Sequence, residues 1–278
     1  MRRTIATILS ITAISIAQVS LADNYQYELN GDAVFFETRG ISEKDATLTG
    51  TYYFSPVTTS GVAYAEAAFL NRAANFGIHL ENGYVSEDEQ SLDYTYRYRE
   101  KENVYGLNAE SWFFNGYLYL SAQTRWFDAH RTGREVVDGV VTYQLDKNFN
   151  TYNSWSLNLG TSPIDGLLIK TRLYDGKFDS ERWNIDVKYV TELLDHTINL
   201  ELEFGEYYET DDIRIAADYY VTKALSVGLL YTQAKYIDKY EDVGARVRYF
   251  ATPNFSVEAQ HVNYAYGDGF TLGATGRF

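Results

Sequence analysis

The chain has 278 residues, 38 acidic against 24 basic side chains, a formal net charge of −14 and no cysteine. The lack of cysteine excludes a disulfide framework, a lipid-modified amino-terminal cysteine and thiolate metal sites. Nucleic acid is disfavoured as a partner, because no basic stripe is present to neutralise phosphates. The 26 tyrosines and 15 phenylalanines favour many strands flanked by tyrosine-rich girdles.

Residues 1–22 have the pattern of a secretory signal peptide. Residues 1–3 carry two arginines, residues 4–17 are uncharged and mostly apolar or small, and Ser20-Leu21-Ala22 supplies the small residues that a signal peptidase reads. An anchoring helix would need about 18 or more apolar residues, and serines and threonines dilute this stretch. We predict cleavage after Ala22, which leaves residues 23–278 with a net charge of −16 once Arg2 and Arg3 are lost.

Residues 23–278 are predicted to form an all-β transmembrane antiparallel β-barrel. No other segment approaches a helical membrane span, so a membrane protein of this sequence must be a closed barrel. From Asn24 onwards, segments of about ten residues alternate apolar and polar positions and are separated by turn residues. A soluble β-sandwich also alternates, but charged faces on so many consecutive strands suit a water-filled lumen better.

We expect about sixteen strands, with 14 or 18 as alternatives, because a barrel with both termini in the periplasm needs an even number. The expected strands cover residues 24–37, 45–54, 75–84, 91–98, 104–113, 117–127, 139–146, 152–160, 166–175, 182–189, 197–204, 213–219, 225–235, 243–249, 255–264 and 269–278. The pattern between residues 61 and 138 leaves the strand assignment open. Residues 62–73 fit a helical turn or an inward-folded constriction as well as a strand.

The last ten residues, Gly269 to Phe278, are predicted to close the barrel. Phe270, Leu272, Ala274 and Phe278 share one face of an extended strand, and polar or small residues share the other. We expect this strand to pair with the first one near residues 25–36, which removes the two edges of the sheet.

The turns are of two kinds. Short turns that begin with aromatic pairs, at residues 219–227 and 249–257, are predicted to be periplasmic. Acidic segments at residues 87–89, 206–212 and 238–242 are predicted to be extracellular loops. Residues 112–116 resemble a periplasmic aromatic turn, although a count of sixteen strands places them outside.

The segment Tyr52-Tyr53-Phe54-Ser55-Pro56-Val57, followed by residues 65–73, resembles a signature of the general porins found in Gram-negative gammaproteobacteria. The likeness covers the whole chain in length and layout. It implies a barrel in the cell outer membrane with passive diffusion as its activity, and a terminal Phe278 that is read by the barrel-assembly machinery. General porins are commonly trimers, so a homotrimer is an expectation from the resemblance alone.

Catalysis and cofactor binding are not expected. None of the four histidines, His79, His130, His196 and His261, has a serine two residues away on its own strand face, as nucleophilic catalysis in a barrel hydrolase would suggest. No spacing of histidines and carboxylates indicates a zinc site, and no glycine pattern cradles a phosphate. We interpret His79 with Glu81 as part of a polar pore wall.

Alternation assigns a set of charged side chains to the lumen. The predicted pore-lining residues are Arg97, Arg99, Arg125, Lys170, Arg172, Arg182, Asp186, Lys188, Glu201, Glu203, Arg214, Arg246 and Arg248. Counting all predicted inward positions, the lumen is nearly balanced in charge, and the acidity belongs to loops and turns. Each charge taken singly fits a salt-bridged ladder along the wall, whereas the cluster of Lys170, Arg172, Arg182 and Lys188 suggests local preference for anions.

Three functions follow from this barrel. The first is a porin that allows passive diffusion of small hydrophilic solutes and ions, because sixteen strands leave an aqueous channel. The second is a substrate-specific channel for acidic oligosaccharides, suggested by the arginines and by Trp126, Trp155 and the tyrosines, which could stack on sugars. Both tryptophans, however, fall on the predicted lipid-facing side. The third is a structural outer-membrane barrel with no conductance.

Overall fold

The computed structural model of the protein describes residues 24–38, 40–176, 181–207, 210–235 and 239–278, so the predicted signal peptide lies outside the described residues. The strands are β1 (Asn24–Thr38), β2 (Ile41–Thr58), β3 (Asn75–Gln90), β4 (Tyr94–Phe113), β5 (Leu118–Val137), β6 (Val140–Thr161), β7 (Leu167–Gly176), β8 (Glu181–Leu193), β9 (His196–Tyr207), β10 (Thr210–Thr222), β11 (Leu225–Lys235), β12 (Lys239–Thr252), β13 (Phe255–Tyr264) and β14 (Gly267–Arg277). Two short helices, η1 (Tyr64–Glu66) and α2 (Ala67–Leu70), lie between β2 and β3. Within the described ranges, no helix has the length and apolar character needed to cross a membrane.

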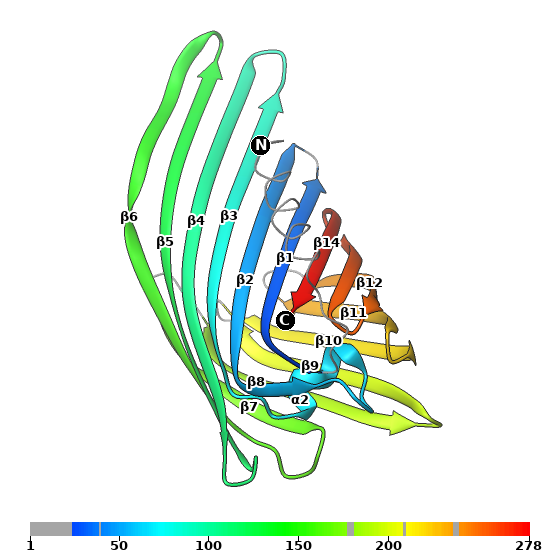
Figure 1. The fold of residues 1–278 in the computed structure, drawn as a ribbon. Coiled ribbons are helices and arrows are strands. Elements are labelled where there is room, and N and C mark those ends of the chain that lie inside the picture. The colour runs from blue at the N-terminus through cyan, green and yellow to red at the C-terminus, as the bar shows by residue number, and fades with distance from the viewer. Residues whose placement is uncertain (1–23, 39, 177–180, 208–209, 236–238) are drawn as a thin grey trace.

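The strands form one closed antiparallel barrel, in which each strand pairs with its neighbours in sequence and β14 pairs with β1 (Figure 1). The β1–β14 register runs from Glu28 opposite Arg277 to Thr38 opposite Gly267. The predicted all-β barrel and the closing role of the last strand are therefore confirmed. Phe278 continues the pairing, since its backbone nitrogen donates to the carbonyl of Tyr27 at 2.8 Å.

The barrel has fourteen described strands, the lower of the predicted alternatives to sixteen. The segments 91–98 and 104–113, expected as two strands, fall on the single strand β4 from residue 94 onwards, and the segments 139–146 and 152–160 fall on the single strand β6 from residue 140 onwards. In β4 the charged residues at 99–102 obscured the alternation, although pairing with β3 and β5 continues through them without a shift. In β6 a register shift against β5, opposite Phe127 and Ala129, interrupts the period.

Fourteen strands also settle where the aromatic turn at residues 112–116 lies. The β4–β5 turn falls at the end of the barrel that holds Asn24 and Phe278, which we call the terminal end, together with the aromatic turns after β10 and β12. Phe114, Asn115 and Gly116 have positive φ angles of 52°, 59° and 89°, as a tight hairpin turn requires. The described parts of the acidic segments lie at the opposite end, which we call the far end.

Strand lengths differ around the barrel. β3, β4, β5 and β6 have 16 to 22 residues, whereas β7 and β13 have 10 each. In Figure 1 these four long strands rise well beyond the others on one side of the barrel. We call their far-end parts, residues 81–90, 94–103, 128–137 and 140–153, the projecting wall. Its β5–β6 hairpin turns at Asp138 and Gly139, whose φ angles of 51° and 76° suit a two-residue hairpin loop.

The outer face of the barrel carries an apolar band. Exposed aliphatic side chains on this face include Leu107, Leu157, Leu159, Ile169, Ile185, Leu200, Leu202, Ile215, Leu229, Val247 and Leu272. Exposed aromatic side chains border the band: Tyr27, Tyr52, Phe54, Phe113, Tyr219 and Tyr249 towards the terminal end, and Tyr105, Trp126, Trp155 and Trp183 towards the far end. An apolar band between two aromatic girdles is the outer surface of a transmembrane barrel. Trp126 and Trp155 point outwards, as predicted.

Candidate functional site

Residues 59–74, which connect β2 to β3, fold into the terminal end of the barrel, and we call them the plug segment. They include η1 and α2, and Figure 1 shows α2 at that end. Of the alternatives left open for residues 62–73, the structure shows short helices that fold inwards and no strand. The Asn71 side-chain amide donates to the carbonyl of Ala67 at 2.7 Å, and Arg72 adopts a φ of 50°, so the helix ends after one turn.

The plug segment packs on the inner wall of β1 and β2. Ala67 and Ala73 lie in one buried cluster with Tyr25, Tyr53 and Val57, which face inwards from these strands. The rings of Tyr25 and Tyr53 meet edge to face with centroids 5.5 Å apart. The small alanine side chains allow this close approach, and the apolar contact stabilises the segment inside the barrel.

Polar contacts join the plug segment to other parts of the barrel around its terminal end. The Tyr64 carbonyl accepts a hydrogen bond from the Arg277 guanidinium of β14 at 2.7 Å, and its backbone nitrogen donates to the carbonyl of Lys223 at 2.9 Å. Arg72 donates to the carbonyl of Asn115 in the β4–β5 turn at 2.8 Å. Since these partners lie in β14, in the β10–β11 turn and in the β4–β5 turn, the segment crosses the terminal end rather than lining one side.

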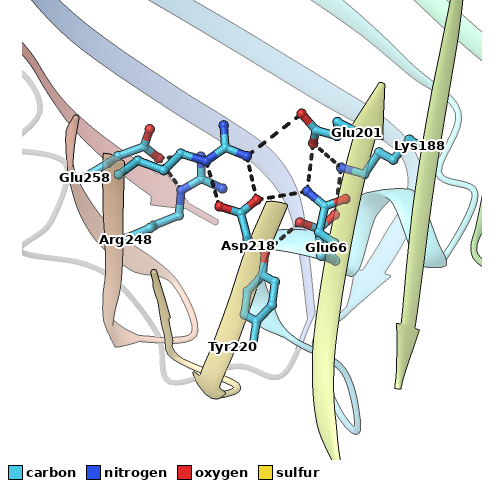
Figure 2. Close-up of polar contacts among 9 residues, drawn as sticks. Glu66, Lys188, Glu201, Asp218, Tyr220, Arg248 and Glu258 are labelled. Atoms are coloured by element: carbon cyan, nitrogen blue, oxygen red, sulfur yellow. Dashed lines mark hydrogen bonds and ion pairs between the residues drawn. The ribbon is translucent and has the colours of Figure 1, made fainter. Parts of the chain in front are cut away.

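Glu66 is the buried charge at the centre of the plug segment, with 3% of its surface exposed. Its carboxylate accepts a hydrogen bond from the Tyr220 hydroxyl at 2.6 Å and lies 2.7 Å from the Lys188 ammonium (Figure 2). Lys188 also lies 3.5 Å from Glu201 and 5.0 Å from the centre of the Phe69 ring. A carboxylate this deeply buried needs such partners, so Glu66 fastens the plug to β8 and β10.

From Glu201 the ion pairs continue across β9, β10 and β12. The Asn199 amide donates to Glu201 at 2.8 Å and to Asp218 at 3.0 Å, and Arg246 contacts Asp218 through Nε at 2.7 Å and Nη2 at 2.5 Å. Arg248 and Glu258 form a further pair beside this one (Figure 2). We call this chain of contacts, from Glu66 to Glu258, the lumen ladder. Each of its three cations pairs with at least one of its four carboxylates.

A second set of ion pairs lies on β7 to β10. Asp186 lies 3.3 Å from Lys170 and 3.8 Å from Arg172, while Glu203 lies 3.6 Å from Arg214. These side chains line a cavity of about 400 Å³ inside the barrel. The cavity adjoins the lumen ladder, since Lys188, Glu201 and Arg246 line it too.

Most of the predicted pore-lining side chains do face the lumen. By alternation against the exposed outer residues, the inward ones are Arg125, Lys170, Arg172, Asp186, Lys188, Glu201, Glu203, Arg214, Arg246 and Arg248. Arg182 lies in β8, but its side chain is outside the described part of the structure. The suggested cationic cluster is not free, because Lys170 and Arg172 pair with Asp186, and Lys188 pairs with Glu66.

Arg97 and Arg99 require a correction, because they point away from the lumen. β4 pairs without a shift through its whole length, so both share the outward face of Tyr105 and Leu107, which are 50% and 38% exposed. Their predicted face came from treating residues 91–98 and 104–113 as two strands, with Arg99 between them. Continuing the two-residue period back from Tyr105 would have placed them correctly.

Sequence reasoning missed an acidic inner face on the projecting wall and the neighbouring part of β2. In the same registers, eight carboxylate side chains face inwards: Glu43, Asp45, Glu81, Glu87, Glu89, Glu100, Glu102 and Glu135. The facing cations there include Arg131, which lies 2.6 Å from Glu100, and Lys147. The far-end half of the lumen is therefore acidic, and the near balance predicted for the whole lumen does not hold.

His79 belongs to the polar wall, as predicted. Its ring nitrogens lie 3.1 Å from the Thr49 hydroxyl and 3.2 Å from a Glu81 carboxylate oxygen. Across the residues that the structure describes, no group of three or more histidines and carboxylates is arranged to hold a metal ion. Charge-lined walls with a constriction are an arrangement for guiding ions and polar solutes.

No family model matches the sequence, and no curated protein matches it. Solved structures share the fold. The crystal structure of the outer membrane protein Omp33 from Acinetobacter baumannii aligns with a TM-score of 0.67 and 22% identity, over 92% of this chain and 99% of that chain. The low-pH structure of OprB from Pseudomonas putida aligns with a TM-score of 0.48 and 8% identity, over 91% and 92%.

A third structure, the KdgM porin in complex with disordered oligogalacturonate, aligns with a TM-score of 0.37 and 12% identity, over 90% of this chain and 99% of that chain. At these identities the likeness shows the fold alone, an outer-membrane type of barrel.

Proposed function

We propose that this chain is a porin of the cell outer membrane that lets small hydrophilic solutes and ions diffuse passively through a narrow lumen. The observation that carries the proposal is the inward display of charged side chains on a closed barrel whose outer face is an apolar band. Barrels of about eight strands are filled by their own side chains, whereas larger ones hold water. The cavity of about 400 Å³ beside the lumen ladder is consistent with such a passage.

The plug segment makes the passage narrow. It crosses the terminal end and is held there by the buried Glu66, by Arg277 and by Arg72. We infer that it sets the conductance and the size limit for solutes. The acidic inner face at the far end would raise the local concentration of cations at the entrance.

The remaining features of the proposal follow the sequence patterns described above, together with the resemblance to the general porins of gammaproteobacteria. Residues 1–22 direct export, Phe278 is read by the barrel-assembly machinery, and the apolar band contacts outer-membrane lipid. The terminal end faces the periplasm, because short turns are typical of that side. The protein is not an enzyme, uses no cofactor and forms a homotrimer.

A channel for acidic oligosaccharides is the second candidate. The observation that favours it is the presence of Lys170, Arg172 and Arg214 around the internal cavity. Against it, each of the three already contacts a carboxylate, and Trp126 and Trp155 face outwards. A non-conducting structural barrel is the third, and the plug segment is the feature that favours it.

Single-channel recording in planar bilayers tests these functions. The wild-type protein is compared with a variant in which residues 62–72 are replaced by a glycine-serine linker of equal length, and with Asn103→Ala as a control on the outward face of the projecting wall. We expect a small steady conductance for wild type and control. The linker variant should conduct severalfold better, because the constriction is removed.

Concentration-dependent block of the wild-type channel by acidic oligosaccharides, without block by neutral ones, would instead support the second candidate. Silence of both the wild type and the linker variant, with normal folding and insertion, would contradict the porin proposal and leave the structural barrel.

A further inference from the structure

The two faces of the projecting wall carry opposite charges. Its inner face is acidic, as described above. On its outer face lie Arg97, Arg99 and Lys101 of β4 and Arg134 of β5, which we call the outer basic patch. In a chain with a net charge of −14, a concentration of cations on one outer surface needs a physical reason.

The pairing of β4 with β5 establishes that the patch points outwards. Tyr105 lies opposite Trp126, and both rings are exposed on the outer face. The same unbroken register places Arg97 opposite Arg134, an even number of residues further along each strand. All four side chains of the patch therefore lie on the outer surface of the barrel. Closer to the terminal end, the same surface forms the apolar band that faces lipid.

The patch lies just beyond the apolar band, past its far-end aromatic girdle. Lys101 is four residues and Arg97 eight residues past Tyr105 of the far-end aromatic girdle, or about 13 Å and 26 Å along the strand at about 3.3 Å per residue. With a strand tilt of about 40°, this places the patch about 10 to 20 Å above the girdle. That layer holds the lipid headgroups, and in the outer leaflet of an outer membrane these are the phosphorylated sugars of lipopolysaccharide.

The arginines border a hollow of about 290 Å³ on the outer surface of β4, β5 and β6. Asp88 accepts two hydrogen bonds from Arg99, at 2.6 and 2.9 Å, and lies 4.0 Å from Arg97, while Asp146 is a second carboxylate at the hollow. Arg97, Arg99 and Arg134 border the hollow with Asp146, Asp88 lies beside it, and Asp128 shares the outward face near Lys101, so the patch keeps one more cation than carboxylates. Asp88 holds both guanidiniums in place, and Arg97 keeps 69% of its side chain exposed.

We propose that the outer basic patch binds the phosphorylated sugars of the outer-leaflet glycolipid. Guanidinium groups present planar, paired donors that match phosphate oxygens, and the hollow between them is open towards the lipid layer. The inference rests on the proposed outer-membrane location, although it does not depend on conduction. If so, the outer face of the projecting wall binds the lipid headgroups. The inner face of the wall still lines the path of solutes.

Binding of the purified protein in detergent to lipopolysaccharide tests this inference. The patch variant carries Arg97→Gln, Arg99→Gln and Arg134→Gln. The matched control carries Arg125→Gln, Arg131→Gln and Lys147→Gln, which remove the same charge from the inner face. Four probes are compared: lipopolysaccharide with a phosphorylated core, the same material after dephosphorylation, phosphatidylglycerol, and inorganic phosphate.

We expect the patch variant to bind phosphorylated lipopolysaccharide about tenfold more weakly than wild type, because three exposed charge pairs are lost. The inner-face control should bind like wild type, and dephosphorylation should weaken wild-type binding to a similar degree. Equal binding by the patch variant, indifference to dephosphorylation, or equally good competition by phosphatidylglycerol or inorganic phosphate would overturn the inference. Conductance of the patch variant is recorded in parallel, so failure of the porin proposal is seen separately.

Discussion

The short-strand side of the barrel, from β7 to β14, and the projecting wall use charge in different ways. On the short-strand side, inward cations and carboxylates pair across neighbouring strands, as Lys188 does with Glu201, or across an intervening strand, as Arg246 does with Asp218. On the projecting wall, carboxylates predominate on the inner face and cations outnumber carboxylates on the outer face. Ion pairs between strands stabilise the barrel wall. Where cations and carboxylates lie on opposite faces, each face keeps a net charge that can attract a solute or a lipid headgroup.

Burial explains why the two regions differ. The Asp218 side chain has 6% of its surface exposed, and a carboxylate there must be compensated locally because water is scarce. The Asp88 side chain on the wall has 56% exposed, and water and salt screen its charge within about 10 Å at 0.1 M ionic strength. Uncompensated charge is therefore tolerated on the wall and costly in the lumen ladder.

Breaking the lumen ladder should have the largest effect on stability. Asp218→Asn leaves Arg246 without its closest carboxylate, and we expect a loss of about 3 kcal/mol in the free energy of unfolding. The double variant with Arg246→Gln should recover part of the loss, because the uncompensated cation is also removed. Urea unfolding of the reconstituted barrel measures both. A loss below about 0.5 kcal/mol for the single variant would show that the pair is not effectively buried.

Releasing the plug from the ladder should change conductance more than stability. Glu66→Ala removes the carboxylate that joins the plug segment to Lys188 and Tyr220, so the segment keeps its apolar packing and loses its central fastening. We expect a severalfold rise in mean current, with frequent transitions between levels, in planar bilayers.

Asp165→Asn is the matched control for the plug. It removes an ion pair of Arg72 whose carboxylate is fully exposed, and therefore should leave the current unchanged. An unaltered current in Glu66→Ala would mean that the plug is held by its apolar contacts alone.

Neutralising the inner face of the wall should alter selectivity and leave the barrel intact. Replacing Glu87, Glu89, Glu100, Glu102 and Glu135 with glutamine removes five carboxylates from the far-end lumen. We expect the ratio of cation to anion permeability to fall about twofold at 0.1 M salt and to change little at 1 M, because screening is stronger there. Reversal potentials across a salt gradient measure the ratio. The patch variant, which changes the outer face of the same wall, should leave it unaltered.

The architecture was predictable because alternation is a local signal that every strand repeats. Leu200 and Leu202 outwards, with Glu201 and Glu203 inwards, follow from the two-residue period alone, and Phe270 to Phe278 identified the closing strand. Strand number was not predictable, because the long strands carry charges on both faces once they leave the membrane, and there the period disappears.

The partners of the lumen charges were less predictable than their faces. Glu66 lies 122 residues before Lys188 in the sequence, and only the inward fold of the plug segment brings them within 2.7 Å. A short alanine-rich run indicated a helix or a constriction, but its position inside the barrel depends on tertiary contacts with Tyr25, Tyr53 and Arg277. Likewise, the acidic inner face becomes visible only when β4 is recognised as one strand.

The smallest effect should come from an ion pair on the wall, which is the direct counterpart of Asp218 and Arg246. Asp88→Asn removes the carboxylate that contacts Arg99 and Arg97, and the expected loss in the free energy of unfolding is below about 1 kcal/mol because the pair is exposed. Urea unfolding under the conditions used for Asp218→Asn allows a direct comparison.

If the patch binds lipid phosphates, the Asp88→Asn variant should bind phosphorylated lipopolysaccharide at least as tightly as wild type, since a carboxylate that competes for the arginines has been removed. A loss of several kcal/mol in the free energy of unfolding for Asp88→Asn would show instead that ion pairs stabilise the wall as strongly as the ladder. A pair this exposed can contribute so much only where another surface packs against the wall and excludes water.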